Sequence, residues 1–435
     1  MSANRGNFSS RFAVVMALAG SAIGLGNIWR FPYMVGQHGG AAFIIIYILC
    51  SIIIALPVFF AESLLGKTTG SDTIGALKKT VKGSPLMAEG GLAVLAAFVI
   101  VSFYSVVGGW SFDYFIRSCT GGFQGLQIDQ AAQTFKGMVD SIWQPLCCLA
   151  VFMAMSGIIV AAGVDKGIGL FSKVMMPILF VMILLIVIRS VSLPGASAGI
   201  EYLVKPDFSK IDGRAIADAL GQSFFSLSLG VGCVLTYSSY MRNEENIFYS
   251  GIWTAVFDTI FALLAGFAIM PAVFASGLEA AAGPSLVYET LPVIFSQMGP
   301  VVPFLFFLAI LIAALTSSIS MMEVCVAWLV DQKHIKRGIA TIIICCLAFL
   351  LGCACAIFPK VFNTCDFMTS NVFMMIGSFV FVIVVAWKIP KIDVRTQFTN
   401  YGTSKAAKAV FPVIWFSIKW LCPIAIVAIA ITNLL

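Results

Sequence analysis

Charged residues are scarce in this chain, and histidine is almost absent. Asp, Glu, Lys and Arg make up 11% of the 435 residues, and there are 2 histidines. Hydrophobic residues reach 60%, which excludes a soluble globular domain of this length. The sequence therefore predicts an all-α polytopic membrane protein, with a single transmembrane domain over residues 1–435 that contacts the lipid bilayer. Its net charge of +6 is spread over short loops, so we expect no nucleic-acid partner.

The shortage of histidine also limits the chemistry. The 12 cysteines lie mostly within apolar runs, where cysteine behaves as a small hydrophobic residue. We therefore expect neither disulfides nor a Cys/His metal site. A membrane enzyme would need a nucleophile–base or metal constellation, which His38 and His334 do not supply, so we expect no enzyme. A channel or receptor would show a continuous pore or a sizeable external domain, and the sequence indicates neither.

Long apolar runs, by contrast, fill the chain. Hydropathy indicates about eleven spans, each long enough to cross a bilayer core of roughly 30 Å. They cover residues 12–36, 41–66, 91–119, 143–162, 168–190, 215–239, 247–276, 300–330, 338–357, 364–387 and 409–434. The first run lacks a signal-peptide cleavage pattern, so it is interpreted as a retained span.

The loops set the orientation. Lys and Arg concentrate in the loops that lie on the same side of the membrane as the N-terminus. This distribution predicts a protein of the cell's inner (plasma) membrane with its N-terminus in the cytoplasm. Residues 67–90 are then a polar internal loop, and residues 388–408 a basic internal linker. On the outside, residues 191–213 form a loop and 277–299 a helical hairpin.

The first span carries a break. Residues 20–32 read Gly-Ser-Ala-Ile-Gly-Leu-Gly-Asn-Ile-Trp-Arg-Phe-Pro, and each glycine weakens a helix by about 1 kcal/mol relative to Ala. Inside a membrane, freed backbone groups are tolerated only where they line a protein cavity. Freed carbonyls there can bind a cation, and freed amides can hold an anionic group. Alternatively, Gly20 and Gly24 form a G-x-x-x-G packing face, which does not explain Asn27 and Arg30.

A second break lies in the sixth span, where residues 222–232 read Gln-Ser-Phe-Phe-Ser-Leu-Ser-Leu-Gly-Val-Gly. Interrupted spans at corresponding positions of two five-span halves are typical of inverted-repeat transporters. We expect a first five-helix repeat over residues 12–190, a second, inverted one over 215–387, and an extra helix at 409–434.

The eighth span contains Ala-Ala-Leu-Thr-Ser-Ser over residues 313–318. Hydroxyls in an apolar helix usually bond back to their own carbonyls. Two broken helices nearby favour a ligand role instead, and oxygen ligands without a carboxylate suit sodium better than calcium or magnesium.

These three motifs together resemble the neurotransmitter:sodium symporter family, specifically its bacterial amino-acid transporters. The resemblance implies a sodium-coupled symporter that imports apolar or aromatic amino acids by alternating access. A proton-coupled amino-acid transporter of similar fold is the alternative. The oligomeric state is left open, because the family usually has twelve spans and this chain shows eleven.

The resemblance implies two sodium sites. One would use the backbone of Gly20, Ile23 and Ala313 with the hydroxyls of Thr316 and Ser317. The other would use Ala22, Asn27, Ser226, Asp258 and the carboxylate of the substrate. A shared carboxylate would couple sodium and substrate affinity reciprocally.

The resemblance also implies the substrate site. The substrate carboxylate would meet the amides near Gly24 and Gly26 and the hydroxyl of Tyr104. The full set of expected substrate-binding residues is Ser21, Ala22, Gly24, Gly26, Ile100, Tyr104, Phe225, Ser226, Ser228, Val231, Ser317 and Met321. Val231 is small and Met321 is flexible, so the pocket is expected to accept a substrate with a bulky apolar side chain.

Transport is expected to need no chloride. In animal members chloride is held by groups that match Tyr47, Gln222 and Ser226, and a matching serine is Ala262 here. The fixed charge of Asp258, one helical turn away, would replace the anion. On the return of the empty carrier Asp258 would bind a proton, which implies proton counter-transport. The alternative is an Asp258 that stays protonated on a neighbouring carbonyl.

Four charged residues and one tyrosine are predicted to form two gates. Arg30 and Asp366 would pair across the external mouth, and Arg5, Asp331 and Tyr240 would close the internal one.

Glu62 lies within the apolar second span. An intramembrane carboxylate suggests function by default. It would accept hydrogen bonds from amides freed by the break in the sixth span, with a proton relay as the alternative.

Overall fold

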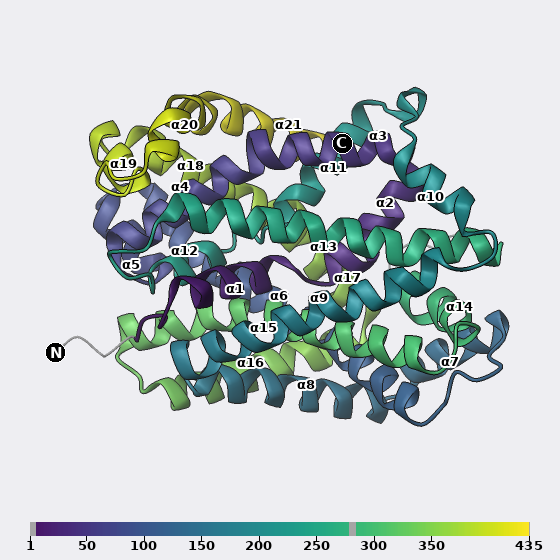
Figure 1. Ribbon diagram of the computed structural model, residues 1–435. Helices are drawn as coiled ribbons and strands as arrows, with labels where there is room; N and C mark the ends of the chain where they lie inside the picture. Colours follow the sequence, from purple (N-terminus) through teal and green to yellow (C-terminus); the bar gives the residue numbers. More distant parts are fainter. Residues whose placement is uncertain (1–5, 278–283, 435) are drawn as a thin grey trace.

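The computed structural model describes residues 6–277 and 284–434, and helices dominate it (Figure 1). Within these residues there is no β-strand, and a single bridge pairs Gly40 with Pro206. The predicted all-α class is therefore confirmed. Long helices lie side by side, with α5 and α19 near one end of the bundle and α7, α10 and α14 near the other.

Nine helices of the described part are long and apolar enough to cross a membrane. They are Ala41–Thr69, Pro85–Cys119, Trp143–Ala161, Val164–Val191, Ile247–Ser276, Val301–Lys333, Arg337–Ile357, Pro359–Trp387 and Lys405–Thr432.

Five of these spans are single helices or nearly so. They comprise α6 (Ala88–Cys119) after η3 (Pro85–Met87), α8 (Trp143–Ala161), α13 (Ile247–Ser276), α15 (Val301–Lys333) and α16 (Arg337–Ile357).

The other four contain a π-helical turn. They comprise α3 (Ala41–Cys50), η2 (Ser51–Ala55) and α4 (Leu56–Thr69); η4 (Val164–Gly169) and α9 (Leu170–Val191); α17 (Pro359–Phe367), η7 (Met368–Phe373) and α18 (Met374–Trp387); and α20 (Lys405–Phe416), η8 (Ser417–Leu421) and α21 (Cys422–Leu434).

The first predicted break is present as a bend. Helix α1 (Arg11–Ala22) includes Gly20 and ends shortly before Gly24, and η1 (Gly26–Arg30) continues into α2 (Phe31–Gln37). The two halves meet at 56° and together make a tenth span.

The second break separates α11 (Gly213–Ser226) from α12 (Cys233–Ser238). Each half is too short to cross a membrane alone. If α11 and α12 are counted as one span, the total reaches the predicted eleven. Their lengths do not establish such a span, so the number eleven stays a prediction.

The segments between the spans contain short helices, two of them within the predicted hairpin. They are α5 (Thr73–Thr80), α7 (Ile128–Asp140), α10 (Ala196–Val204), η5 (Phe208–Lys210), η6 (Leu286–Thr290), α14 (Leu291–Ser296) and α19 (Lys391–Phe398). The expected hairpin over 277–299 includes residues 278–283, which lie outside the described residues.

The centre of the bundle holds α6 and α15, which pack against each other. The most apolar window of α15 is 83% buried and that of the α6 span 72%, against 33% for α16 and for the last span. Helix α1 packs on α13, α9 and α15. The break therefore lies beside the most buried helix of the molecule rather than facing lipid.

Candidate functional site

The backbone freed by the first break is satisfied by side chains. Gly24 N donates to Asn27 Oδ1 at 3.2 Å, and Leu25 N donates to the Tyr104 hydroxyl at 3.3 Å. On the carbonyl side, Ser317 Oγ lies 3.5 Å from both Ser21 O and Ile23 O. Ser21 O also accepts a hydrogen bond from the Ser228 hydroxyl at 2.8 Å. The first break is therefore held by side chains that line the cavity.

The second break is held by turns and by a buried carboxylate. Ser228 and Gly230 have positive φ angles of 53° and 81°. Gly230 N donates to Glu62 Oε1 at 2.7 Å, and Glu62 is fully buried. A Cβ atom on Gly230 would overlap the Met374 carbonyl oxygen, so both the turn and the packing require glycine.

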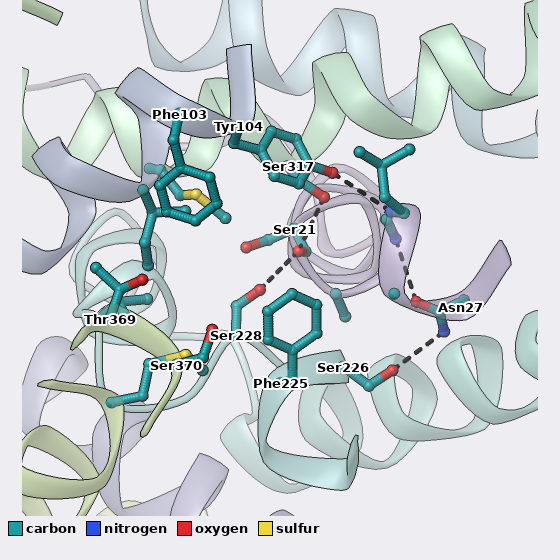
Figure 2. Close-up of a pocket in the computed structure, with 18 residues that line it drawn as sticks. Ser21, Asn27, Phe103, Tyr104, Phe225, Ser226, Ser228, Ser317, Thr369 and Ser370 are labelled. Carbon is teal, nitrogen blue, oxygen red and sulfur yellow. Dashed lines mark hydrogen bonds between the residues drawn. The ribbon is translucent and has the colours of Figure 1, made fainter. Parts of the chain in front are cut away.

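A small cavity of about 40 Å³ lies between the two breaks. All twelve expected substrate-binding residues line it, together with Leu25, Asn27, Phe103, Thr369, Ser370 and Met374. Figure 2 shows Phe225 between Ser228 and Ser226, with Thr369 and Ser370 on the side of the cavity away from Asn27. Room for a few water molecules is less than a large amino acid needs. Flexible side chains such as Met321 must move to admit one.

Oxygen atoms of the first expected sodium site gather below the break. The Thr316 hydroxyl donates to Ala313 O at 3.0 Å, and a Cβ on Gly20 would meet Thr316 Cβ at 3.3 Å. Ser317 faces Ile23 O, as described above. The donor set is neutral carbonyls and hydroxyls, which suits a hard monovalent cation.

Asp258 of α13 is at the centre of a second polar cluster. Its Oδ1 accepts hydrogen bonds from Asn27 Nδ2 and from Ser226 Oγ, both at 2.8 Å. Its Oδ2 accepts from the Tyr47 hydroxyl at 3.2 Å. Gln222 instead donates to Gly26 O at 3.2 Å. The carboxylate thus lies against two of the three side chains expected to hold chloride in animal relatives.

The expected external gate residues are not paired in this structure. Among the described residues there is no ion pair between Arg30 and Asp366, and Arg30 lies over the Phe225 ring at 5.2 Å. The two charges nevertheless interact electrostatically. Arg30 therefore contacts the ring of Phe225, which lines the cavity, instead of forming the expected ion pair.

At the internal end, Tyr240 donates to Glu323 Oε1 at 2.6 Å. The guanidinium of Arg337 pairs with the same buried carboxylate. Asp331 accepts a hydrogen bond from Asp72 N at 3.0 Å, and Arg5 lies outside the described residues.

Sequence reasoning missed several of these residues. Glu323 and Arg337 lie close to a basic loop, where charges usually face solvent. The Thr369 hydroxyl donates to the carbonyl of Cys365, four residues earlier, at 2.7 Å. Hydroxyls within helices usually make such bonds. Of the missed residues, Phe103 could have been predicted, because it follows the expected lining residue Ile100 by one helical turn.

A membrane bundle with two broken helices, a cavity between them and clustered oxygen atoms is typical of secondary transporters. The chain belongs to the sodium:neurotransmitter symporter family, whose model matches residues 5–136 and 124–435. It is therefore a multi-pass, sodium-dependent transporter of this family and not an enzyme, as predicted.

The chain has relatives of similar length. It is 38% identical to the uncharacterized sodium-dependent transporter YhdH of Bacillus subtilis, over 97% of this chain and 96% of that protein. An uncharacterized sodium-dependent transporter of Haemophilus influenzae is 35% identical, over 99% and 98%. The crystal structure of MhsT in complex with L-phenylalanine matches with a TM-score of 0.90 and 34% identity, over 99% of this chain and 100% of that one.

Proposed function

We propose that this protein imports large apolar or aromatic amino acids together with sodium by alternating access. The observation that carries the proposal is the cavity between the two broken helices, which combines the backbone amides and carbonyls of the first break with an apolar lining. A zwitterionic head group would fit the amide and carbonyl edges of the breaks. The side chain would extend between Ile100, Val231 and Met321.

The lining supports a neutral substrate. Among the cavity residues there is no carboxylate and no cationic side chain. An acidic or basic side chain would therefore be buried without a partner, which is costly. The bound L-phenylalanine of the related MhsT structure agrees with this choice.

Two sodium ions are proposed to accompany the substrate. One lies among the oxygens of Gly20, Ile23, Ala313, Thr316 and Ser317. The other lies among Ala22, Asn27, Ser226, Asp258 and the substrate carboxylate. Because the second ion shares a ligand with the substrate, each raises the affinity of the other.

Chloride independence rests on Asp258. Its buried carboxylate already accepts hydrogen bonds from Tyr47 and Ser226, so a fixed negative charge is present near the second sodium ion. In the empty carrier the same carboxylate has no cation beside it. A proton is then expected to neutralise it on the return step, which gives sodium-in, proton-out exchange.

The gates and the topology complete the proposal. Arg30 and Asp366 would close together over the bound substrate, while Tyr240, Asp331 and Arg5 close the opposite mouth. The two five-helix repeats would be inverted about the membrane plane, with the N-terminus in the cytoplasm of the inner membrane.

The test is uptake of labelled phenylalanine into proteoliposomes that contain the purified protein. We expect uptake to follow an inward sodium gradient and to fail with an inward proton gradient alone. Excess leucine, methionine, tyrosine or tryptophan should compete. Uptake driven by protons without sodium would favour the proton-coupled alternative. Competition by glycine or glutamate above all large apolar amino acids would contradict the substrate class.

A further inference from the structure

Two cysteines from neighbouring helices bring their thiols together beside Asp366. Cys355 lies in the last turn of α16 and Cys365 in α17. Their Sγ atoms are 4.0 Å apart. Among the hydrogen bonds of the described residues, this is the one that joins two cysteines.

The geometry allows the pair to become a disulfide. A disulfide bond is about 2.05 Å long, so the sulfur atoms must approach each other by about 2 Å. Phe358 alone separates the two helices along the chain, so the two side chains project from adjacent helix ends. Cys355 is 3% exposed and Cys365 is half-buried, so a reagent would reach Cys365 first.

Cys365 is also connected to the cavity. It directly precedes Asp366, and the Thr369 hydroxyl donates to the carbonyls of Cys365 and Asp366 at 2.7 and 3.1 Å. Thr369 and Ser370 line the cavity. A restraint on Cys365 therefore acts on the segment that carries both the gate carboxylate and one wall of the cavity.

We propose that Cys355 and Cys365 form a redox-convertible pair, and that a small-molecule disulfide oxidises it to a bond that holds α17 against α16 and slows the gate. The Cys365 thiolate attacks the reagent disulfide, forms a mixed disulfide and releases one reagent thiol. Cys355 then displaces the second reagent thiol. The pair loses two electrons and two protons, and the reagent gains them as two thiols.

The chain contains its own control for reagent access. Phe362 of α17 packs against Phe103 and Trp110 of α6, with ring centroids 5.5 and 6.1 Å apart. Helix α6 ends at Cys119, which is exposed. Modification of Cys119 thus reports that the reagent reacts with an exposed thiol of the protein under the conditions used.

The experiment treats the full-length protein with oxidised glutathione and maps its peptides under non-reducing conditions. We expect a peptide linked through Cys355 and Cys365, lost on treatment with dithiothreitol. Glutathione on Cys119 without any linked peptide would overturn the proposal. This measurement does not depend on transport, so its outcome is separate from that of the proposed function.

The uptake readout rests on the proposed function. Oxidation should lower the initial uptake rate several-fold, with recovery after dithiothreitol. Cys365→Ser and Cys355→Ala should both remove the effect, and Cys119→Ser should keep it. A linked peptide with an unchanged uptake rate would contradict the coupling to the gate and overturn the proposal.

Discussion

The two broken helices satisfy their interrupted backbone hydrogen bonds in different ways. In the first break, amides donate to Asn27 and Tyr104 over 3.2 and 3.3 Å, and the Ile23 carbonyl meets a hydroxyl only at 3.5 Å. In the second, backbone turns and the Glu62 carboxylate satisfy the chain, with the Glu62 contact at 2.7 Å. Bonds of 3.1 and 3.2 Å, from Ser228 N to Phe225 O and from Leu229 N to Phe224 O, complete the second break. The first break is therefore held by side chains that line the cavity, whereas the second is held largely by its own backbone and by Glu62.

This difference assigns different tasks to the two breaks. Side chains that line the cavity can exchange their hydrogen bonds for contacts with a bound ion or substrate. A turn held by its own backbone does not depend on a bound ligand. Substitutions of Gly230 and Glu62, which support the backbone of the second break, should therefore act on stability, whereas those of side chains that line the cavity should act on binding.

The largest loss of stability is expected for Gly230→Ala. The added Cβ would overlap the Met374 carbonyl oxygen at a φ of +81°. A left-handed conformation costs about 1–2 kcal/mol for Ala, and overpacking adds about 1–3 kcal/mol. The midpoint of thermal unfolding of the detergent-solubilised protein should fall accordingly.

Gly221→Ala is the matched control, because a Cβ there meets no atom within 4 Å. It lies within α11, where Ala is preferred to Gly by about 0.5–1 kcal/mol. It should leave the unfolding midpoint unchanged or raise it. Equal midpoints for the two alanine variants would contradict a second break fixed by packing.

A smaller loss is expected for Glu62→Ala, which leaves Gly230 N buried without an acceptor. The cost of such an unpaired group is about 1–3 kcal/mol. Glu62→Gln retains a carbonyl oxygen as acceptor and should recover most of the unfolding midpoint. If Glu62→Gln destabilises the protein as much as Glu62→Ala, a retained carbonyl acceptor does not suffice, which would contradict the hydrogen-bonding role assigned to Glu62.

The smallest loss of stability is expected for Tyr104→Phe at the first break. The hydroxyl accepts one long hydrogen bond from Leu25 N, so the unfolding midpoint should barely change. Binding should suffer instead, because a hydrogen bond to the charged substrate carboxylate is worth about 1.5–3 kcal/mol. Isothermal titration with phenylalanine in sodium buffer should show an affinity at least tenfold lower. Unchanged affinity would remove Tyr104 from the substrate site.

How far the sequence predicts this architecture depends on the kind of signal. The breaks were predictable, because glycines and polar residues inside an apolar run, such as Asn27, are costly in a membrane unless they line a protein cavity. The short helices α10 and α19 were not, since polar connecting segments carry weak periodicity.

At the site, backbone ligands follow from the break, whereas contacts between distant segments do not. The pairing of Glu323 with Arg337 and the inward position of Ser370 depend on helix rotation and packing. A single hydroxyl or charge in the sequence does not specify these.

The central claim is that the fixed carboxylate of Asp258, beside the second sodium ion, replaces the chloride of animal relatives. The most direct measurement is sodium-driven phenylalanine uptake into proteoliposomes with gluconate in place of chloride, for the wild type and for Asp258→Asn. We predict that the wild type keeps its full uptake rate in gluconate, while Asp258→Asn loses most of its rate there. Loss of wild-type uptake in gluconate, or an Asp258→Asn variant that is fully active without chloride, would contradict this claim.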